Sequence, residues 1–423
     1  MVYEPGTRVP LLYRWGSVSK NLRKERETIP VKSMDLFDKC YQFTTADEVR
    51  EKGIYPYFHE LQSKQANEVI MEGKRRIMLG SNNYLGLTTN PEVMEAAIKA
   101  VEKYGTGCSG SRFLNGTLEL HIELEEELAK FLGKEAVVTF STGFQTNLGI
   151  ISSLVRIGDY VVCDKENHAS IYDGCKLSFG KKVTFNHSDM EDLERVLKTI
   201  PEEAGKLIVT DGVFSMGGDI AKLPEIVRLA KQYNARVMVD DSHALGVIGK
   251  GGRGTASHFN LEDDVDIYMG TFSKSLASLG GFMATSYKVA DFVRHNSRPF
   301  IFSASMTPSS AASALAALKV LESHPELVDK LRHNSQYMRQ KLVEKGVETM
   351  MSETPIIPIY TYELERTLFI TKRLFDEGVY ANSSVPPATP PDGCLVRTSL
   401  MATHTDELID EAVEIISRVL KEC

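Results

Sequence analysis

The feature that most constrains the fold is a regular alternation of short apolar segments with longer amphipathic ones through the middle of the chain. Apolar strands separated by amphipathic helices are typical of a parallel sheet that helices cover on both faces. The sequence therefore predicts an α/β fold with a mainly parallel central sheet. The expected strands are Ala136–Phe140, Tyr160–Cys163, Lys182–Phe185, Leu207–Thr210, Val237–Asp240, Ile267–Gly270 and Phe282–Ala284.

Helices are expected before the first strand and after the last one. Pro91 to Tyr104 has apolar residues at helical spacing, and Leu118 to Leu132 has Thr117 as a candidate N-cap and Gly133 just past its end. Beyond a helix near Pro308–Glu322, the pattern changes to that of a smaller C-terminal α+β domain. Its expected elements are a strand at Ile356–Tyr360, a helix from about Glu363 to Glu377, a strand at Leu395–Leu400 and a helix at Thr405–Lys421.

Length and composition are those of an ordinary globular protein. The 423 residues are 42% hydrophobic and 25% charged, and a chain of this length normally forms more than one domain. We expect an N-terminal segment at 1–75, a large domain at 76–325 and a small domain at 326–423. The formal net charge of −8 argues against nucleic-acid binding.

The sequence shows no membrane span or signal peptide. No run of about 18 apolar residues occurs, and Met1 to Glu27 has basic residues but no apolar core. The six cysteines have neither Cys-x-x-Cys spacing nor metal-ligand spacing with histidines, which favours reduced thiols. We therefore expect a cytoplasmic protein without a metal site, and peripheral membrane contact by the basic N-terminal segment stays open.

One lysine lies in an unusual place. Lys274 is part of the small, hydroxyl-rich segment Gly270–Gly281, directly after a strand that we expect to be buried. Lysine is normally a surface residue, so a lysine among Ser and Thr at the end of a core strand is well placed to form a Schiff base with a carbonyl cofactor. The alternative is an ordinary surface lysine.

A carboxylate and an imidazole end the preceding strand. Asp240 closes the β-branched strand Val237–Asp240, and His243 follows after two residues. Pyridoxal phosphate (PLP) chemistry needs a Schiff-base lysine, a carboxylate that keeps the pyridine nitrogen protonated and a donor for the ring hydroxyl. We prefer Asp240 to Asp241 as that carboxylate because Asp240 ends the strand. The alternative is an aspartate that caps a helix.

Two glycine-containing segments could bind phosphate. Ser141–Gln145 follows a strand and opens a helix, where free N–H groups and the positive helix end bind anions, although any such turn favours Ser and Gly. Gly105–Gly110 matches G-x-G-x-x-G, but it follows a helical pattern rather than a strand. We therefore reject a dinucleotide site and expect a flexible loop near the active site.

Two further residues are candidates on weaker grounds. His168 follows the Tyr160–Cys163 strand, although a lone histidine is more often a structural residue. Arg397 lies in an apolar β-pattern, where a charge is costly unless it is paired, and a substrate carboxylate would pair it. The alternative for Arg397 is an edge-strand arginine exposed to solvent.

Taken together, the motifs resemble those of the α-oxoamine synthases, a family of fold-type I PLP-dependent transferases with the aspartate aminotransferase-like fold. The similarity runs from about Gly53 to near the C-terminus, and several ordered motifs are hard to match by chance. The motifs that carry it are Gly80-Ser-Asn82-Asn-Tyr84-Leu-Gly86, Gly105-Thr-Gly107-Cys-Ser-Gly110-Ser-Arg112, Phe140-Ser-Thr-Gly143-Phe144-Gln-Thr-Asn147, His168-Ala-Ser-Ile-Tyr-Asp-Gly-Cys175 and Arg298-Pro-Phe-Ile-Phe302-Ser303.

The resemblance implies a cofactor site for PLP. Gly143 and Phe144 would bind its phosphate, Thr271 and Ser273 would add hydroxyl groups, and Ser303 would reach in from the partner subunit of a homodimer with a shared active site. We expect no metal at this site.

The resemblance also implies a substrate site. His168 would stack on the cofactor ring and touch the substrate carboxylate, which Arg397 would bind, while Asn82 would face the partner's site and Ser215 would lie near the ring. Some relatives have a second arginine twelve residues before the one that matches Arg397; this chain has Val385 there and so has no counterpart of that arginine.

The implied reaction is a decarboxylating condensation of an amino acid with an acyl-CoA. The segment His168–Cys175 is most similar to family members that join L-serine and palmitoyl-CoA to 3-ketodihydrosphingosine, the first intermediate of sphingolipid synthesis. Other members use glycine or alanine, as glycine C-acetyltransferase and 8-amino-7-oxononanoate synthase do, and a non-catalytic partner subunit is a further alternative. The expected catalytic residues are Lys274, His168, Asp240 and His243.

Overall fold

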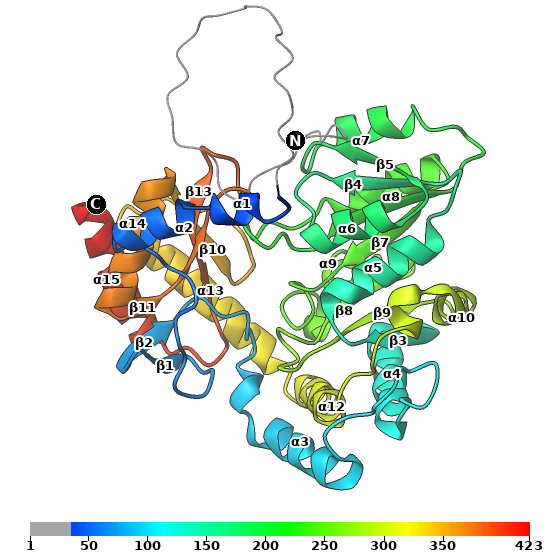
Figure 1. Ribbon diagram of the computed structural model, residues 1–423, viewed down its shortest axis with the longest axis horizontal. Helices are drawn as coiled ribbons and strands as arrows, with labels where there is room; N and C mark the ends of the chain where they lie inside the picture. The colour runs from blue at the N-terminus through cyan, green and yellow to red at the C-terminus, as the bar shows by residue number, and fades with distance from the viewer. Residues whose placement is uncertain (1–34) are drawn as a thin grey trace, which may run out of the picture.

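The computed structural model describes residues 35–423, in which a large domain carries a seven-stranded sheet (Figure 1). The strand order is β3-β9-β8-β7-β6-β4-β5, and all pairs are parallel except the two that β9 forms with β3 and β8. The mainly parallel sheet predicted from the sequence is therefore confirmed. The strands are β3 (Ala136–Phe140), β4 (Tyr160–Asp164), β5 (Lys181–Phe185), β6 (Lys206–Asp211), β7 (Arg236–Asp240), β8 (Ile267–Thr271) and β9 (Gly281–Thr285).

Helices cover both faces of this sheet, as its apolar strands require. Every residue of β3, β6, β8 and β9 is buried. In every strand but β5, alternate side chains enter two separate apolar clusters, because successive residues of a strand point to opposite faces. One cluster includes α5 (Gly143–Leu154), α6 (Ala169–Leu177), α10 (Tyr287–Asn296) and α11 (Arg298–Ile301), and the other α4 (Glu119–Leu132), α7 (Met190–Leu197), α8 (Leu223–Gln232), α9 (Thr255–Phe259) and α12 (Pro308–Ser323).

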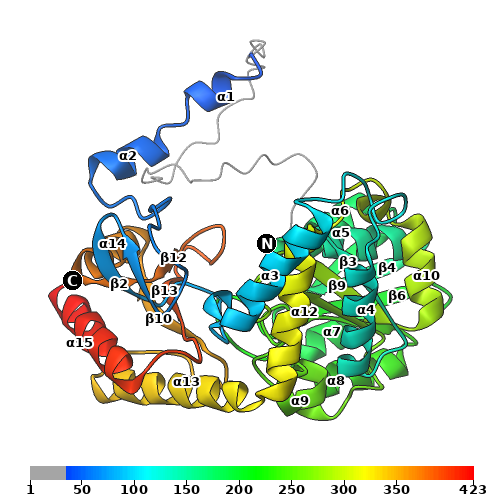
Figure 2. The ribbon, with the colours of Figure 1, turned by 90° about the horizontal axis from the view of Figure 1, so that it is seen from below.

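The expected N-cap of α4 is wrong by one residue. The cap is Leu118, whose backbone N–H donates to Nδ1 of His121 at 3.0 Å. The Thr117 hydroxyl instead accepts from Nε of Arg112 at 3.1 Å and donates to the Arg112 carbonyl. The Thr117 side chain therefore makes a contact within the loop before α4 in place of the cap that local preference predicts. The preceding helix, α3 (Pro91–Tyr104), is capped by Asn90 and lies along α12 (Figure 2).

The C-terminal part forms a smaller α+β unit. Its sheet has β13 (Cys394–Ser399) between β10 (Ile356–Tyr362) and β12 (Asn382–Ser384). The helices of this part are α13 (Glu326–Glu344), which the sequence pattern did not reveal, α14 (Leu364–Glu377) and α15 (Asp406–Glu422). In Figure 2, α13 and α15 lie side by side.

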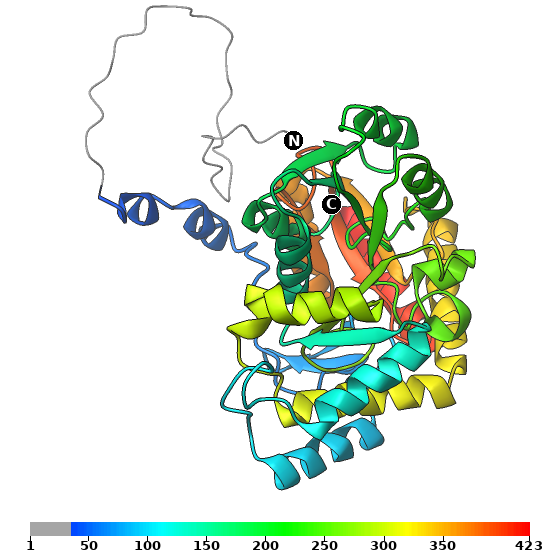
Figure 3. The ribbon, with the colours of Figure 1, turned by 90° about the vertical axis from the view of Figure 1, so that its right-hand side faces the viewer.

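Residues before the large domain join this smaller unit. Strands β1 (Glu68–Met71) and β2 (Lys74–Met78) form a sheet in which β2 pairs with β11 (Val379–Tyr380). The domain boundaries expected from the sequence stay a prediction, and the part of the N-terminal segment at 1–34 lies outside the described residues. Figures 2 and 3 show α1 (Asp38–Tyr41) standing away from the two domains, whereas α2 (Thr45–Glu51) packs its Val49 against an apolar cluster of the small domain.

The remaining elements are short, namely the 3-10 helices at Leu87–Thr89 and Lys250–Gly252. Within residues 35–423, no helix is both long enough and apolar enough to cross a bilayer.

A buried ion pair attaches the loop after α3 to the central sheet. The guanidinium of Arg112 donates to both carboxylate oxygens of Glu125, at 2.7 and 3.2 Å, and both side chains are 7% exposed. The backbone N–H of Thr139 in β3 donates to the same carboxylate at 2.9 Å. The carboxylate therefore connects the loop, α4 and β3.

We predict that Glu125→Ala lowers the free energy of unfolding by about 3–5 kcal/mol, because it leaves the Arg112 charge buried without its anionic partner. The measurement is the urea midpoint of the purified variant. The control is Glu95→Ala, which breaks an exposed pair with Lys99 and should cost less than about 0.5 kcal/mol. Equal midpoints for the two variants would contradict the prediction.

Candidate active site

The candidate site lies at the carboxyl ends of three adjacent parallel strands. Asp211 ends β6, Asp240 ends β7 opposite it, and Thr271 ends β8. Lys274 follows in the turn after β8. The carboxyl edge of a parallel sheet is the usual location of ligand sites in α/β proteins. The pKa of Asp211 is raised well above its ordinary value, first by burial and then by the nearby charge of Asp240.

Asp240 and Asp241 have different surroundings. Asp240 is buried and accepts hydrogen bonds from Nδ2 of Asn147 at 2.7 Å and from the backbone N–H of Ser242 at 3.0 Å. Asp241 is buried in another place, where it accepts from the backbone N–H of Thr255 at 3.0 Å, and burial raises its pKa to about 7. Of these two aspartates, Asp240 is the one whose charge acts on Lys274.

The pKa of the Lys274 amine is lower than that of an ordinary lysine. Burial lowers its pKa to about 8, while Asp240 and Asp211 favour the charged form and Arg397 disfavours it. Within residues 35–423 the Lys274 amine makes no hydrogen bond or ion pair, and only the backbone carbonyl of Lys274 accepts, from the Ala277 N–H at 3.0 Å. An amine with this pKa is partly unprotonated near neutral pH, which a lysine nucleophile or base requires.

His168 is the N-cap of α6 and faces the same space. Its backbone N–H donates to Oδ2 of Asp211 at 3.2 Å, and its ring lies edge to face with Phe144 at 6.3 Å between centroids. Burial lowers the pKa of His168, with a smaller opposing effect of Asp240 and a further lowering by Lys274. The imidazole is therefore neutral near pH 7.

His243 and Tyr84 form a second buried pair in the site. Nδ1 of His243 lies 2.7 Å from the Tyr84 hydroxyl, and burial lowers the pKa of His243 well below its ordinary value. The same hydroxyl accepts a longer hydrogen bond from Nη2 of Arg397, at 3.4 Å. Sequence reasoning did not assign a role to Tyr84, although it lies in one of the motifs that carry the family resemblance.

Arg397 is buried in the middle strand of its sheet, so the solvent-exposed edge-strand alternative is wrong. Its guanidinium donates to the Ser215 carbonyl, to Oγ of Ser399 at 2.7 Å and to Oδ1 of Asn82 at 3.1 Å. None of these acceptors is charged, and no carboxylate within residues 35–423 forms an ion pair with it. A buried cation with only neutral partners is costly, so this site favours an anionic ligand.

An anion site of a different kind lies at the start of α5. Thr142 caps the helix by accepting from the Gln145 N–H at 3.1 Å, and the Gly143 and Phe144 amides make no hydrogen bond with the residues described. A Cβ on Gly143 would lie 2.7 Å from Oγ1 of Thr271, which is itself 2.9 Å from Oγ of Ser273. Only glycine leaves this helix end open beside two hydroxyl groups.

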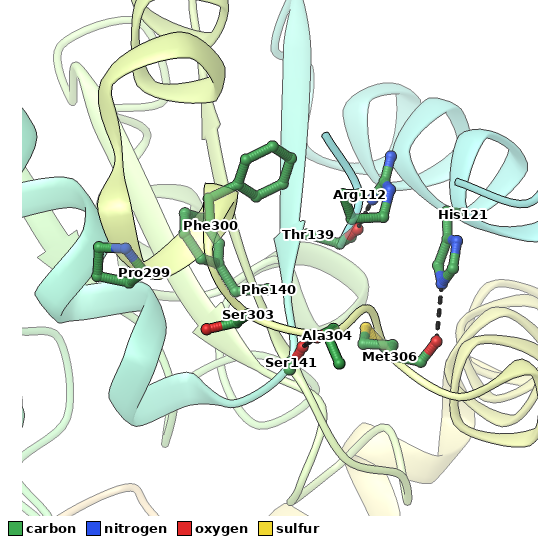
Figure 4. Close-up of a pocket in the computed structure, with 10 residues that line it drawn as sticks. All are labelled: Arg112, His121, Thr139, Phe140, Ser141, Pro299, Phe300, Ser303, Ala304 and Met306. Carbon is green, nitrogen blue, oxygen red and sulfur yellow. Dashed lines mark hydrogen bonds between the residues drawn. The ribbon is translucent and has the colours of Figure 1, made fainter. Parts of the chain in front are cut away.

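Ser303 approaches this helix from the side. Figure 4 shows Ser303 and Ala304 beside Ser141. In the same segment, the Met306 carbonyl forms a hydrogen bond with Nε2 of His121 at 3.1 Å. The Ser303 hydroxyl accepts a hydrogen bond from Gln145 of the same chain. Its expected reach into a partner subunit stays a prediction, as does that of Asn82, which here contacts Arg397 of its own chain.

These groups fit PLP. Asp240 could hold a proton on the pyridine nitrogen, Lys274 could bind the aldehyde, and the His168 ring could cover one face of the pyridine. The open end of α5 could bind the phosphate with its amides and the nearby hydroxyl groups. In the described part of the chain, no group of three or more His, Cys, Asp and Glu side chains is arranged to hold a metal ion.

Comparisons with known proteins agree on one family. The family model for aminotransferase class I and II matches residues 74–416. The chain is 54% identical over 387 residues to serine palmitoyltransferase of Sphingobacterium spiritivorum, covering 92% of this chain and 97% of that one. It is 44% identical over 377 residues to 8-amino-7-oxononanoate synthase of Thermoanaerobacter pseudethanolicus, covering 89% and 95%.

A solved structure is similar over nearly the same range. The serine palmitoyltransferase of S. paucimobilis with a bound PLP–myriocin aldimine superimposes with a TM-score of 0.89 at 36% identity, covering 92% of this chain and 99% of that one. The shared fold is therefore the fold-type I arrangement of PLP-dependent transferases, as the sequence predicts.

We predict opposite shifts of the Lys274 pKa in two variants of the cofactor-free protein. Asp240→Asn should lower it below about 8, because Asp240 favours the ammonium form, and Arg397→Gln should raise it, because Arg397 opposes that form. The pH dependence of Lys274 acetylation by acetic anhydride, read by peptide mass spectrometry, gives the pKa. The exposed Lys198 is the internal control. A wild-type pKa near the ordinary 10.5, or shifts of the reverse sign, would contradict the prediction.

Proposed function

Because the chain belongs to the aminotransferase class I and II family, and within it to the α-oxoamine synthases, we propose that it is a PLP-dependent acyltransferase that condenses L-serine with a long-chain acyl-CoA. With palmitoyl-CoA, the product is 3-ketodihydrosphingosine, which makes this the first step of sphingolipid synthesis. The relatives named serine palmitoyltransferase match at higher identity than those named 8-amino-7-oxononanoate synthase, so the second activity is the weaker alternative.

The observation that carries the proposal is that two basic side chains of different character, Arg397 and Lys274, lie in one site. Arg397 is a permanent buried charge with neutral partners, suited to an amino-acid carboxylate. Lys274 is an amine whose charge is weakened by burial and by Arg397, suited to carbonyl and proton-transfer chemistry. An amino-acid substrate of a carbonyl cofactor needs both groups within the length of one small molecule.

Binding and orientation come from the chain's own residues. Arg397 binds the serine carboxylate, and its hydrogen bonds to Asn82 and Tyr84 hold the planar guanidinium in one orientation. His243 fixes Tyr84 through its Nδ1 and thereby joins this group to the end of β7. The neutral ring of His168 bounds the site beside Lys274.

The chemistry uses the differences in charge among these groups. When bound, PLP supplies an electron sink for the carbanion at the serine Cα. Asp240 holds the proton on the ring nitrogen, and Lys274 takes the proton from Cα as its pKa near 8 permits. In the whole reaction a bond forms between Cα and the acyl carbon, and the thioester C–S bond breaks to release CoA. The bond from Cα to the carboxylate then breaks to release carbon dioxide, and Cα takes up a proton in place of the one that Lys274 removed.

We further propose that two copies of the chain form a homodimer. Phe113, Leu114 and Phe302 are 47%, 76% and 77% exposed, on two segments joined by the hydrogen bond from Ser305 N–H to the Gly110 carbonyl. Adjacent exposed aromatic and aliphatic side chains are typical of an interface, and Ser303 lies in the second segment. Partner contact here would bring both chains to one site.

Other expectations stay predictions. These are the cytoplasmic location and peripheral membrane contact by the N-terminal segment, of which residues 1–34 lie outside the described range. The alternative of a non-catalytic subunit is disfavoured because the chain has Lys274 and Asp240 together, in the arrangement that PLP chemistry needs.

We predict that the purified protein with PLP releases 3-ketodihydrosphingosine from L-serine and palmitoyl-CoA, as measured by mass spectrometry. Lys274→Ala should reduce the rate at least about 100-fold, because it removes the base. Lys198→Ala changes an exposed lysine and is the matched control. Product from glycine or alanine but not from serine would favour the other α-oxoamine synthases instead.

We predict that Arg397→Ala weakens L-serine binding by about 30- to 1000-fold, the effect of losing about 2–4 kcal/mol from a buried charge pair. The change in PLP absorbance on titration with L-serine gives the dissociation constant, and the absorbance before serine is added should stay that of the wild type. Arg373→Ala, which removes an arginine on the surface of the small domain, is the control. Unchanged serine affinity in Arg397→Ala would show that the carboxylate binds elsewhere.

A further inference from the structure

His168 is connected to Asp240 by hydrogen bonds through two residues to which the reaction has given no role. Nδ2 of Asn147, on α5, lies 2.7 Å from Oδ2 of Asp240 and 2.9 Å from Oγ of Ser170. The same Ser170 oxygen lies 2.7 Å from Nδ1 of His168. Asn147 and Ser170 are each 1% exposed, so no solvent competes for these contacts.

The direction of the first two hydrogen bonds follows from the acceptors. A carboxylate oxygen without a proton only accepts, so the Asn147 amide must present its nitrogen to Asp240. The second N–H of that nitrogen then donates to the Ser170 hydroxyl oxygen. The reverse amide orientation would place two acceptor oxygens against each other, so the arrangement holds even though the amide oxygen itself has no partner among the described residues.

The direction of the last hydrogen bond follows from a backbone amide. The N–H of Ser170 donates to Nδ1 of His168 at 3.3 Å, as part of the helix cap. A backbone N–H can only donate, so Nδ1 has no proton and must accept from the Ser170 hydroxyl as well. The neutral His168 ring therefore has its proton on Nε2, which makes no hydrogen bond with the described residues.

We propose that Asn147 and Ser170 are positioning residues that fix His168 as an Nε2–H hydrogen-bond donor to an oxygen of the substrate and connect its ring to Asp240. This role rests on the proposed function. The fixed tautomer also determines which residue acts as the base. Nε2 already has a proton and Nδ1 is occupied by two donors, so His168 does not take the Cα proton, and the base is Lys274.

The surrounding charges agree with a neutral ring. Asp240 on β7 raises the pKa of His168, while burial and Lys274 lower it, and the net direction is downward. The other ionisable groups that face it are Asp211 on β6, which accepts from the His168 backbone N–H, and His243. The two donors at Nδ1 act in the same direction as burial, because protonation of Nδ1 would break the hydrogen bond from the Ser170 backbone N–H and force the Ser170 hydroxyl to turn from donor to acceptor.

The test is the pKa of His168 in the cofactor-free protein, measured by mass spectrometry from the pH dependence of hydrogen–deuterium exchange at the imidazole C2. Ser170→Ala should raise this pKa, because it removes the hydroxyl donor to Nδ1. Ser170→Cys, with a weaker donor, should give a value between those of the wild type and Ser170→Ala. Buried His121, with a pKa of about 4, is an internal reference that should not change.

A second, kinetic experiment uses the PLP-loaded enzyme. Ser170→Ala should lower kcat for condensation at least about 10-fold with a smaller effect on KM for L-serine, because a hydrogen bond to developing charge is weakened. Ser153→Ala is the matched control, since Ser153 is also buried but donates only to carbonyls within α5.

A His168 pKa that is the same in the wild type, Ser170→Cys and Ser170→Ala would overturn the proposal, because no donor would then be acting on Nδ1. The graded rise in pKa supports it. If that rise is found in a protein that makes no product from L-serine, the assignment of the tautomer is supported and the proposed function is the part that fails.

Discussion

The arrangement of this site depends on one buried guanidinium. Arg397 joins three segments that are far apart in the chain, because it donates to Asn82, to the Ser215 carbonyl and to Ser399. The first segment precedes the large domain's sheet, the second follows β6, and the third is in the small domain. An arginine that is buried with neutral partners keeps most of the cost of its desolvation, and an anionic ligand between the two domains would offset that cost.

The other ionisable groups of the site lie at or near the carboxyl edge of the sheet, where burial sets their charge. Strands β6, β7 and β8 are apolar through their middle residues, 207–209, 237–239 and 267–269, and end in Asp211, Asp240 and Thr271, so polar groups are brought together at the carboxyl edge of the sheet. Burial there lowers the pKa of Lys274 and of both site histidines. The fold thus provides a carboxylate, a weakened amine and neutral imidazoles next to a permanent cation, which is the set of charges that amino-acid chemistry on PLP requires.

The sequence predicted what local patterns encode. The central strands, the helix opening at Gly143 and the position of Lys274 after β8 follow from apolar periodicity and from turn residues. Contacts between distant segments were beyond it. The connection from Asp240 through Asn147 and Ser170 to His168 joins three elements whose packing no local pattern specifies. Even within one loop, the hydrogen bond between the Arg112 side chain and Thr117 was not apparent from cap preferences.

The most direct test of this account compares L-serine with serinol, in which a hydroxymethyl group replaces the carboxylate, by calorimetric titration of the PLP-loaded wild-type protein. If the buried Arg397 charge is there to bind a carboxylate, serinol should bind at least about 30-fold more weakly, the effect of about 2 kcal/mol for a buried charge pair. Equal affinities for L-serine and serinol would contradict the account, because the carboxylate would then contribute nothing to binding.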